Sequence, residues 1–192
     1  MSSTGRQFVS RAGEKLSWAL DAFGIDVRGL LCADFGCNVG GFTDCLLDRG
    51  AAKVYAIDAG YGQLAWRLRK DARVVVMERT NALYVEPPER VDLVTIDVAW
   101  TPQSLAAPAA RRWINDAGRI VSLLKPHYEL AKMKGRKPSG KLDSAEARQV
   151  CLDVCRRLGS VGCEVAAVAR STLLGKGGNE EFLLLVRAGG TG

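Results

Sequence analysis

The fold of this chain is decided by a turn sequence, Asp34-Phe35-Gly36-Cys37-Asn38-Val39-Gly40-Gly41-Phe42-Thr43. The residues before it, 30–33, are apolar and read as a buried strand, and the residues from Phe42 onward have the spacing of an amphipathic helix. Glycines at such a turn let the backbone curl tightly and leave no side chain between the main chain and a ligand. A second strand, Lys53–Ile57, ends on Asp58, where a carboxylate can accept hydrogen bonds from ribose hydroxyls. Together these features predict half of a nucleoside-binding site.

The spacing of the glycines argues against a dinucleotide. The fingerprint for nicotinamide dinucleotides, G-x-G-x-x-G, places a helix N-terminus against a pyrophosphate. Here the pattern is acid-x-Gly-x-x-x-Gly-Gly and begins with Asp34. A carboxylate at this point repels a pyrophosphate, but it suits a ligand with a cationic amino-acid end, as S-adenosylmethionine has. An ordinary turn is the other interpretation, and Asp58 at the next strand end favours the cofactor site over it.

Length and composition describe an ordinary globular protein with a basic surplus. The chain has 192 residues, of which 47% are hydrophobic and 25% charged, and this suits one domain with a substantial core. Its net charge of +6 serves solubility or a polyanionic partner. Six cysteines without a C-x-x-C pair, and a single histidine, favour buried thiols over zinc ligands or disulfides, so no metal is expected. No signal peptide or membrane span is recognised, which predicts a cytoplasmic protein.

Strand-like and helical segments alternate along the chain. The expected strands are Leu31–Phe35, Lys53–Ile57, Arg73–Met77, Val91–Ile96, Arg119–Leu124, Cys163–Ala169 and Glu181–Val186. The expected helices are Ser10–Phe23, Gly41–Asp48, Gln63–Arg69, Pro102–Asn115 and Asp143–Leu158. This alternation predicts an α/β fold with a seven-stranded, mostly parallel, doubly wound sheet. Because no helix separates the last two strands, one of them is expected to run antiparallel.

The connection over residues 126–142 is long for such a sheet and carries five basic residues. It leaves the carboxyl end of a strand, which is the edge where sheets of this kind bind ligands. A solvated mobile loop is one interpretation. The other is a segment that contacts the phosphates of RNA, through Lys134, Arg136, Lys137 and Lys141.

Two of the expected strands are followed by residues that can take part in catalysis: Asp97 follows one strand and Lys125 follows another. An aspartate and a lysine at neighbouring strand ends can form a charge pair around an acceptor hydroxyl, although a structural salt bridge would look the same. Lys15 lies on the first helix, whose apolar face other residues already supply. Glu181 opens the final strand after a glycine-rich loop, which can bring the backbone close to a ligand.

Seven segments form an ordered pattern along nearly the whole chain: Val9–Leu16 (VSRAGEKL), Gly40–Asp44 (GGFTD), Val54–Leu64 (VYAIDAGYGQL), Met77–Ala82 (MERTNA), Ile96–Val98 (IDV), Leu124–Pro126 (LKP) and Gly178–Leu183 (GNEEFL). This pattern resembles the TlyA/hemolysin-like branch of the FtsJ methyltransferases. The resemblance implies a Rossmann-like class I S-adenosylmethionine-dependent methyltransferase, which methylates ribose 2′-hydroxyls of RNA, above all ribosomal RNA.

The resemblance also implies the residues of the site. The family's Lys-Asp-Lys-Glu tetrad maps onto Lys15, Asp97, Lys125 and Glu181, the last preferred to Glu180 because it directly precedes the Phe-Leu pair. A lysine beside a second lysine can act as a base, so Lys125 is the expected base. The cofactor is expected to contact Asp34, Gly36, Gly40, Phe42, Asp58, Asn81 and Asp97. Core packing explains Phe42 equally well, and a turn is the alternative role of Asn81.

Some features depart from the family pattern. Its longer members carry an additional N-terminal RNA-binding domain, and residues 1–192 read instead as a single methyltransferase domain, with the helix in 1–24 contributing to the site. The loop centre Cys37-Asn38-Val39 stands where small residues are expected, which leaves the cofactor affinity open. A methyltransferase for a non-RNA hydroxyl and a silent RNA-binding protein on the same fold remain alternatives. The hemolysin label suggests membrane damage, which lacks support from any long amphipathic helix. The RNA, the methylated nucleotide and the oligomeric state stay open.

Overall fold

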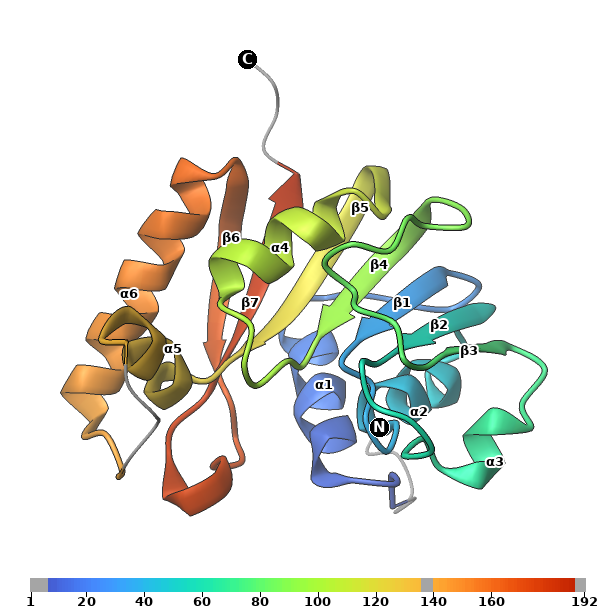
Figure 1. Ribbon diagram of the computed structural model, residues 1–192, viewed down its shortest axis with the longest axis horizontal. Helices are drawn as coiled ribbons and strands as arrows, with labels where there is room; N and C mark the ends of the chain where they lie inside the picture. The colour runs from blue at the N-terminus through green and yellow to red at the C-terminus, as the bar shows by residue number, and fades with distance from the viewer. Residues whose placement is uncertain (1–6, 136–139, 189–192) are drawn as a thin grey trace.

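The computed structural model describes residues 7–135 and 140–188 and contains one central sheet with helices on both faces (Figure 1). Its seven strands lie in the order β3-β2-β1-β4-β5-β7-β6. Their bounds are β1 Leu31–Phe35, β2 Lys53–Ile57, β3 Val74–Met77, β4 Val91–Ile96, β5 Ile114–Leu124, β6 Cys163–Arg170 and β7 Phe182–Ala188.

The sheet is parallel except at β7, which runs antiparallel to both of its neighbours, β5 and β6. A chain that returns without a crossover helix must reverse its direction, and only a short 3₁₀ turn, η1 (Lys176–Gly178), lies between β6 and β7. The prediction of a mostly parallel seven-stranded sheet with one antiparallel strand is therefore confirmed. The strand order reverses between β1 and β4, which in doubly wound sheets is where ligands bind.

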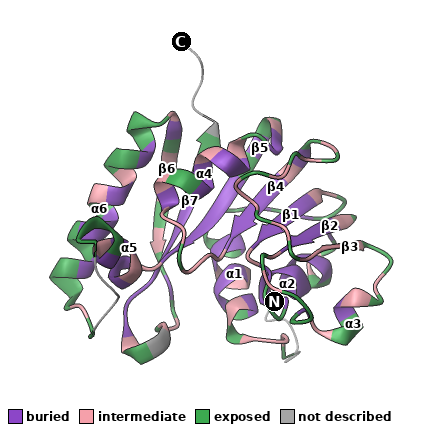
Figure 2. Ribbon diagram, viewed as in Figure 1, coloured by how far each residue is buried: buried purple, intermediate pink, exposed green. Residues whose placement is uncertain are grey.

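Two hydrophobic clusters lie on opposite faces of the sheet. The strands between them are largely buried (Figure 2). One face carries α1 (Arg11–Ala22), α2 (Gly41–Asp48) and α3 (Trp66–Arg69), and the other carries α4 (Gln103–Arg111), α5 (Pro126–Met133) and α6 (Ser144–Ser160). Successive strand residues alternate between them: Cys32 faces α1 and α2, whereas Ala33 belongs to the other cluster. Burial of both faces explains why the central strands β1, β2 and β4 are apolar almost throughout.

Several expected bounds differ from the structure: β5 begins at Ile114 and not at Arg119, and β7 begins at Phe182 and not at Glu181. The helix expected over Pro102–Asn115 ends at Arg111, because Trp113 is fully buried beneath the sheet and β5 begins at Ile114. The segment 126–142 is not a loop throughout, since it begins with α5. Pro126 occupies the first turn of this helix, where its missing N–H costs nothing, and the Glu129 carboxylate accepts a hydrogen bond from the backbone of α4. The helix expected from Gln63 begins only at Trp66.

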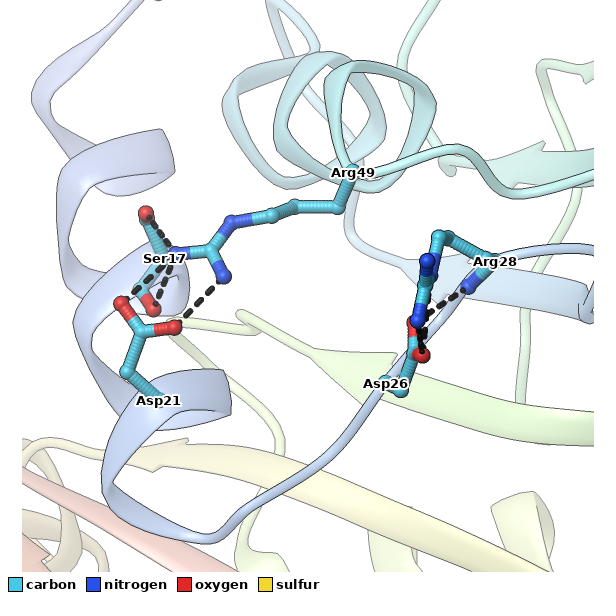
Figure 3. Close-up of polar contacts among 5 residues, drawn as sticks. All are labelled: Ser17, Asp21, Asp26, Arg28 and Arg49. Carbon is cyan, nitrogen blue, oxygen red and sulfur yellow. Dashed lines mark hydrogen bonds and ion pairs between the residues drawn. The ribbon is translucent and has the colours of Figure 1, made fainter. Parts of the chain in front are cut away.

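Helix α1 is fastened to the end of α2 by one arginine (Figure 3). Arg49, the C-cap of α2, pairs with both carboxylate oxygens of Asp21 at 2.5 and 2.7 Å and donates to the hydroxyl of Ser17 at 2.7 Å. It also donates to the Ser17 carbonyl oxygen. This clamp holds the last turns of the helix that carries Lys15. Figure 3 also draws the Arg28–Asp26 pair, whose partners are two residues apart in one loop.

The Arg49 clamp predicts a stability effect. Replacing Arg49 with Ala is expected to lower the free energy of unfolding by about 1 kcal/mol, because it removes a half-buried multidentate contact whose partner Asp21 is largely exposed. Urea unfolding followed by circular dichroism measures this loss. Arg28→Ala is the matched control, and its solvated local pair should contribute nothing measurable. Equal losses in the two variants would contradict the clamp.

Candidate active site

The glycine turn at the end of β1 forms the floor of the site. Gly36 has φ +80°, and a Cβ there would lie 2.8 Å from the Asp97 carbonyl oxygen. Gly40 has φ +98° and is the N-cap of α2. Between them Asn38 has φ +48°, a conformation that asparagine tolerates better than most residues, and its N–H donates to Asp58 Oδ2 at 2.9 Å. The unusual loop centre is thus compatible with the turn.

Asp34 is fully buried and makes all of its hydrogen bonds inside the protein. Its Oδ2 accepts from the backbone N–H and the hydroxyl of Thr43 at 2.9 and 2.7 Å, and its Oδ1 accepts from Thr95 at 3.2 Å. It therefore ties the first turn of α2 to β1 and β4. Burial raises the pKa of Asp34 to about 7, with a smaller contribution from the charge of Asp97, while the hydrogen bonds from Thr43 and Thr95 act in the opposite direction.

A cavity of 440 Å³ opens beside the turn, at the carboxyl ends of β1, β2 and β4. Asp58 and Asn81, both predicted to bind the cofactor, line it together with the backbone of Gly36. Asp58 is held rigidly, because each of its oxygens accepts a backbone N–H, one from Asn38 and one from Gly60. The side-chain oxygen of Asn81 accepts a hydrogen bond from the backbone N–H of Leu83, two residues further along. This agrees with the alternative role of Asn81 as a turn residue.

A smaller cavity of 220 Å³ adjoins the first, since both are lined by Gly36, Asn38, Asp97 and Ala99. It also touches Lys125 and the start of α1. Phe42 lines it as well, although the side chain is 2% exposed and packs in the cluster beneath α1. The position of Phe42 is therefore compatible with both of its expected roles, contact with the cofactor and packing in the core.

The four expected tetrad residues form two ion pairs. Lys15 Nζ donates to Glu181 Oε2 at 2.5 Å, and these residues are only 8% and 3% exposed. Lys125 Nζ donates to Asp97 Oδ1 at the wall of the smaller cavity. Each ammonium thus has its own carboxylate, as burial of charge demands. The charges of the four groups cancel.

The sheet explains why these residues meet. Leu124 pairs with Phe182 across β5 and β7, so Lys125 and Glu181 occupy the next position of the same ladder. Asp97 follows β4, the other neighbour of β5, so all three lie along one edge of the sheet. Lys15 reaches that edge from α1 through its ion pair.

One residue of this arrangement was missed in the sequence. A Cβ at Gly175 would lie 2.0 Å from Glu181 Oε1, so the backbone of this loop rests directly on the carboxylate. The glycine-rich run before the last strand was a visible signal, but its contact with Glu181 was not. Asn179, 4% exposed, accepts the Leu142 N–H and joins this loop to the segment before α6.

The remaining expected residues are the four basic ones of the segment 126–142. Lys134 and Lys141 are exposed, and Arg136 and Lys137 lie outside the described residues. All six cysteines are free thiols. Within 7–135 and 140–188, no three histidine, cysteine, aspartate or glutamate side chains are grouped so that they could hold a metal ion.

The glycine turn at the strand-order reversal, the cavity beside it and the antiparallel β7 give the chain the Rossmann-like fold that class I methyltransferases share. The sequence model of the FtsJ-like methyltransferases matches residues 8–188. The chain belongs to this family.

Individual relatives agree with this assignment. The chain is 44% identical over 186 residues to the 16S/23S rRNA (cytidine-2′-O)-methyltransferase TlyA of Mycobacterium tuberculosis, covering 95% of this chain and 69% of that protein. It is 35% identical to Hemolysin A of Brachyspira hyodysenteriae, with 92% and 75% covered. A crystal structure described as a putative hemolysin from Lactococcus lactis superposes with a TM-score of 0.87 at 34% identity, over 96% of this chain and 91% of that one. Among the described helices, none is both long and apolar enough to pass through a bilayer.

The buried carboxylate predicts a pH-dependent stability. Asp34 has a pKa of about 7 in the folded state against an ordinary value of 3.8, so between these values the folded protein keeps a proton that the unfolded chain has lost. The free energy of unfolding therefore contains a contribution that falls as pH rises from about 4 to 7 and levels off above that range. Asp34→Asn is expected to flatten this fall in urea titrations across the range.

Asp116→Asn, at an exposed position of β5, is the control and should leave the slope unchanged. If the free energy of unfolding falls equally with pH in wild type and in Asp34→Asn, the raised pKa of Asp34 is contradicted.

Proposed function

We propose that this protein transfers a methyl group from S-adenosylmethionine to a ribose 2′-hydroxyl of ribosomal RNA. The observation that carries the proposal is the formation of two lysine–carboxylate pairs, Lys15–Glu181 and Lys125–Asp97, at the edge of the sheet where the glycine turn lies, the second of them at the wall of the smaller cavity. Membership of the FtsJ-like family and the rRNA (cytidine-2′-O)-methyltransferase named among its relatives support it.

The two adjoining cavities fit S-adenosylmethionine, which supplies a methyl group bound to a positively charged sulfur. Gly36 leaves its backbone open where a side chain would collide with the Asp97 carbonyl. Asp58 would accept the ribose hydroxyls, because its oxygens each have a lone pair left beyond the backbone N–H they already accept. Asn81 would lie near the adenine. Gly40 and Phe42 would surround the methionine end, and Asp34 would act on that end by holding the turn.

The chain's own residues would prepare the hydroxyl. A ribose 2′-hydroxyl is a weak nucleophile, so its attack needs alignment and a group that receives its proton. Lys125 Nζ would be that group once it has given up its ammonium proton, and the hydrogen bond to Asp97 holds it at the wall of the smaller cavity. The Lys15–Glu181 pair would hold the hydroxyl and the phosphate.

RNA is the substrate that suits the charge of the molecule. The net charge of +6 and the exposed Lys134 and Lys141 would attract a polyanion. Ribosomal RNA as the substrate, together with six free thiols, fits a cytoplasmic enzyme. A methyltransferase for another hydroxyl, or a silent RNA-binding protein, would bind S-adenosylmethionine or RNA but would leave no methyl on RNA ribose.

The decisive experiment replaces Lys125 with Ala. Methyl transfer from radiolabelled S-adenosylmethionine to ribosomal subunits or total RNA is expected to fall at least about 100-fold, because the proton acceptor is gone. Cofactor binding, measured by calorimetry, should stay near wild type. Lys53→Ala, whose side chain pairs with Glu89 at the start of β2, is the matched control and should retain activity. Full turnover by the Lys125 variant would sink the assignment of the base.

The exposed Lys134 predicts a salt-dependent contribution to RNA binding. Lys134→Ala is expected to weaken binding of ribosomal RNA fragments evenly across sequences and to reduce the slope of log affinity against log salt by about 1. Fluorescence anisotropy at several salt concentrations measures both effects, with Lys53→Ala again as control. An unchanged slope would exclude Lys134 from the RNA interface.

A further inference from the structure

A third cavity lies on the α6 face of the sheet. It is close to the sheet edge that carries Lys125 and Glu181 but separate from the two cavities described above. It has a volume of 490 Å³ and is formed where β6 ends, α6 begins and η1 leads into β7. We call it the Glu180 pocket, and it is lined by Lys141, Leu142, Asp143, Ser144, Arg170, Leu174, Gly178 and Glu180.

Glu180 carries an unused acceptor in this pocket. The residue is 8% exposed, and its Oε1 accepts the Ser144 hydroxyl at 2.6 Å and lies 3.2 Å from Arg170 Nη2. Its Oε2 is buried and has no hydrogen-bond partner among the described residues. A buried carboxylate oxygen without a donor is costly. The terminal torsion of a glutamate turns readily, so a small rotation can present this oxygen to a donor in the pocket.

The surroundings limit what that donor can be. The other carboxylate of the pocket, Asp143, is occupied by capping α6, where it accepts the N–H groups of Ala145 and Glu146. No metal-binding group of side chains includes Glu180 within the described parts of the chain. The exposed Lys141 and Arg170 place positive charge on the rim. A ligand that offers a neutral N–H donor next to an anion satisfies both features.

The position of the pocket links it to the substrate. Neighbouring residues at the start of β7 point to opposite faces of the sheet, so Glu181 reaches Lys15 on the α1 side while Glu180 faces α6. The pocket is therefore one residue away from the catalytic pair, yet separated from it by the strand. A nucleotide held there would be a neighbour of the methylated nucleotide and not that nucleotide itself.

Resting on the proposed function, we propose that the Glu180 pocket receives a base of the RNA next to the methylated nucleotide and selects one with an exocyclic amino group. The amino group donates to Glu180 Oε2, as carboxylates read the N4 amino group of cytosine elsewhere. Lys141 and Arg170 contact the adjoining phosphates. Unpaired bases of RNA are commonly read in this way, by their hydrogen-bonding edges.

The test compares short single-stranded oligocytidine and oligouridine, which share a backbone and differ by an amino group against a carbonyl. Fluorescence anisotropy is expected to give wild-type protein an affinity about tenfold higher for oligocytidine. Glu180→Gln keeps an oxygen for Ser144 and Arg170 but offers an amide N–H₂ to the pocket, so the ratio should fall to about one or reverse. Glu180→Asp withdraws the carboxylate while keeping its charge, and it should also lose the preference.

Glu164→Gln, on the exposed side of β6, makes the same change of charge and should keep the tenfold ratio. Equal affinities in wild type, or a ratio unchanged in either folded Glu180 variant, overturn the inference. If the wild-type protein methylates ribosomal RNA but shows no base preference, only the inference about the Glu180 pocket fails. If the protein transfers no methyl group to any RNA, the proposed function itself fails.

Discussion

The structure depends on the pairing of buried charges between its first helix and its last strand. Lys15 and Glu181 stand 166 positions apart in the sequence and are both nearly inaccessible to water. Either charge alone would be strongly destabilising in such a place. The surrounding features serve this pair: the Arg49 clamp holds α1 against α2, and the absence of a side chain at Gly175 leaves room for the carboxylate. Lys125 and Asp97 repeat the arrangement in a more open position, at the wall of the smaller cavity.

The glycine turn has its own buried anchor. Asp34 looks, in sequence, like a residue that touches the ligand, but in the structure it secures the start of α2 from within. The strain of a turn with three residues at positive φ is offset by that hydrogen-bonded carboxyl group and by Asp58, which receives the Asn38 N–H. The ligand-facing surface of the turn is therefore mostly backbone, which is the surface that a nucleoside cofactor needs.

Much of the site could be predicted because it follows strand ends. Asp58, Asp97 and Lys125 each come directly after an apolar run, and parallel strands bring their carboxyl ends to one edge whatever lies between them. Lys15 and Glu181 came from the family resemblance, since a helix and an antiparallel strand give no such rule. Helix α5 was missed because its buried residues include His127 and Glu129, which do not read as a hydrophobic face. The unused oxygen of Glu180 has no counterpart in sequence, because it exists only through what surrounds it.

By itself, then, the sequence determined the alternation of strands and helices, the glycine turn and the residues available for chemistry, since hydrophobic periodicity and backbone freedom are local properties. Only the tertiary structure decided which carboxylate each lysine meets, which acids are buried and which glycine must stay bare. Those outcomes come from distances across the sheet and from the exclusion of water, and both exist only once the chain has packed.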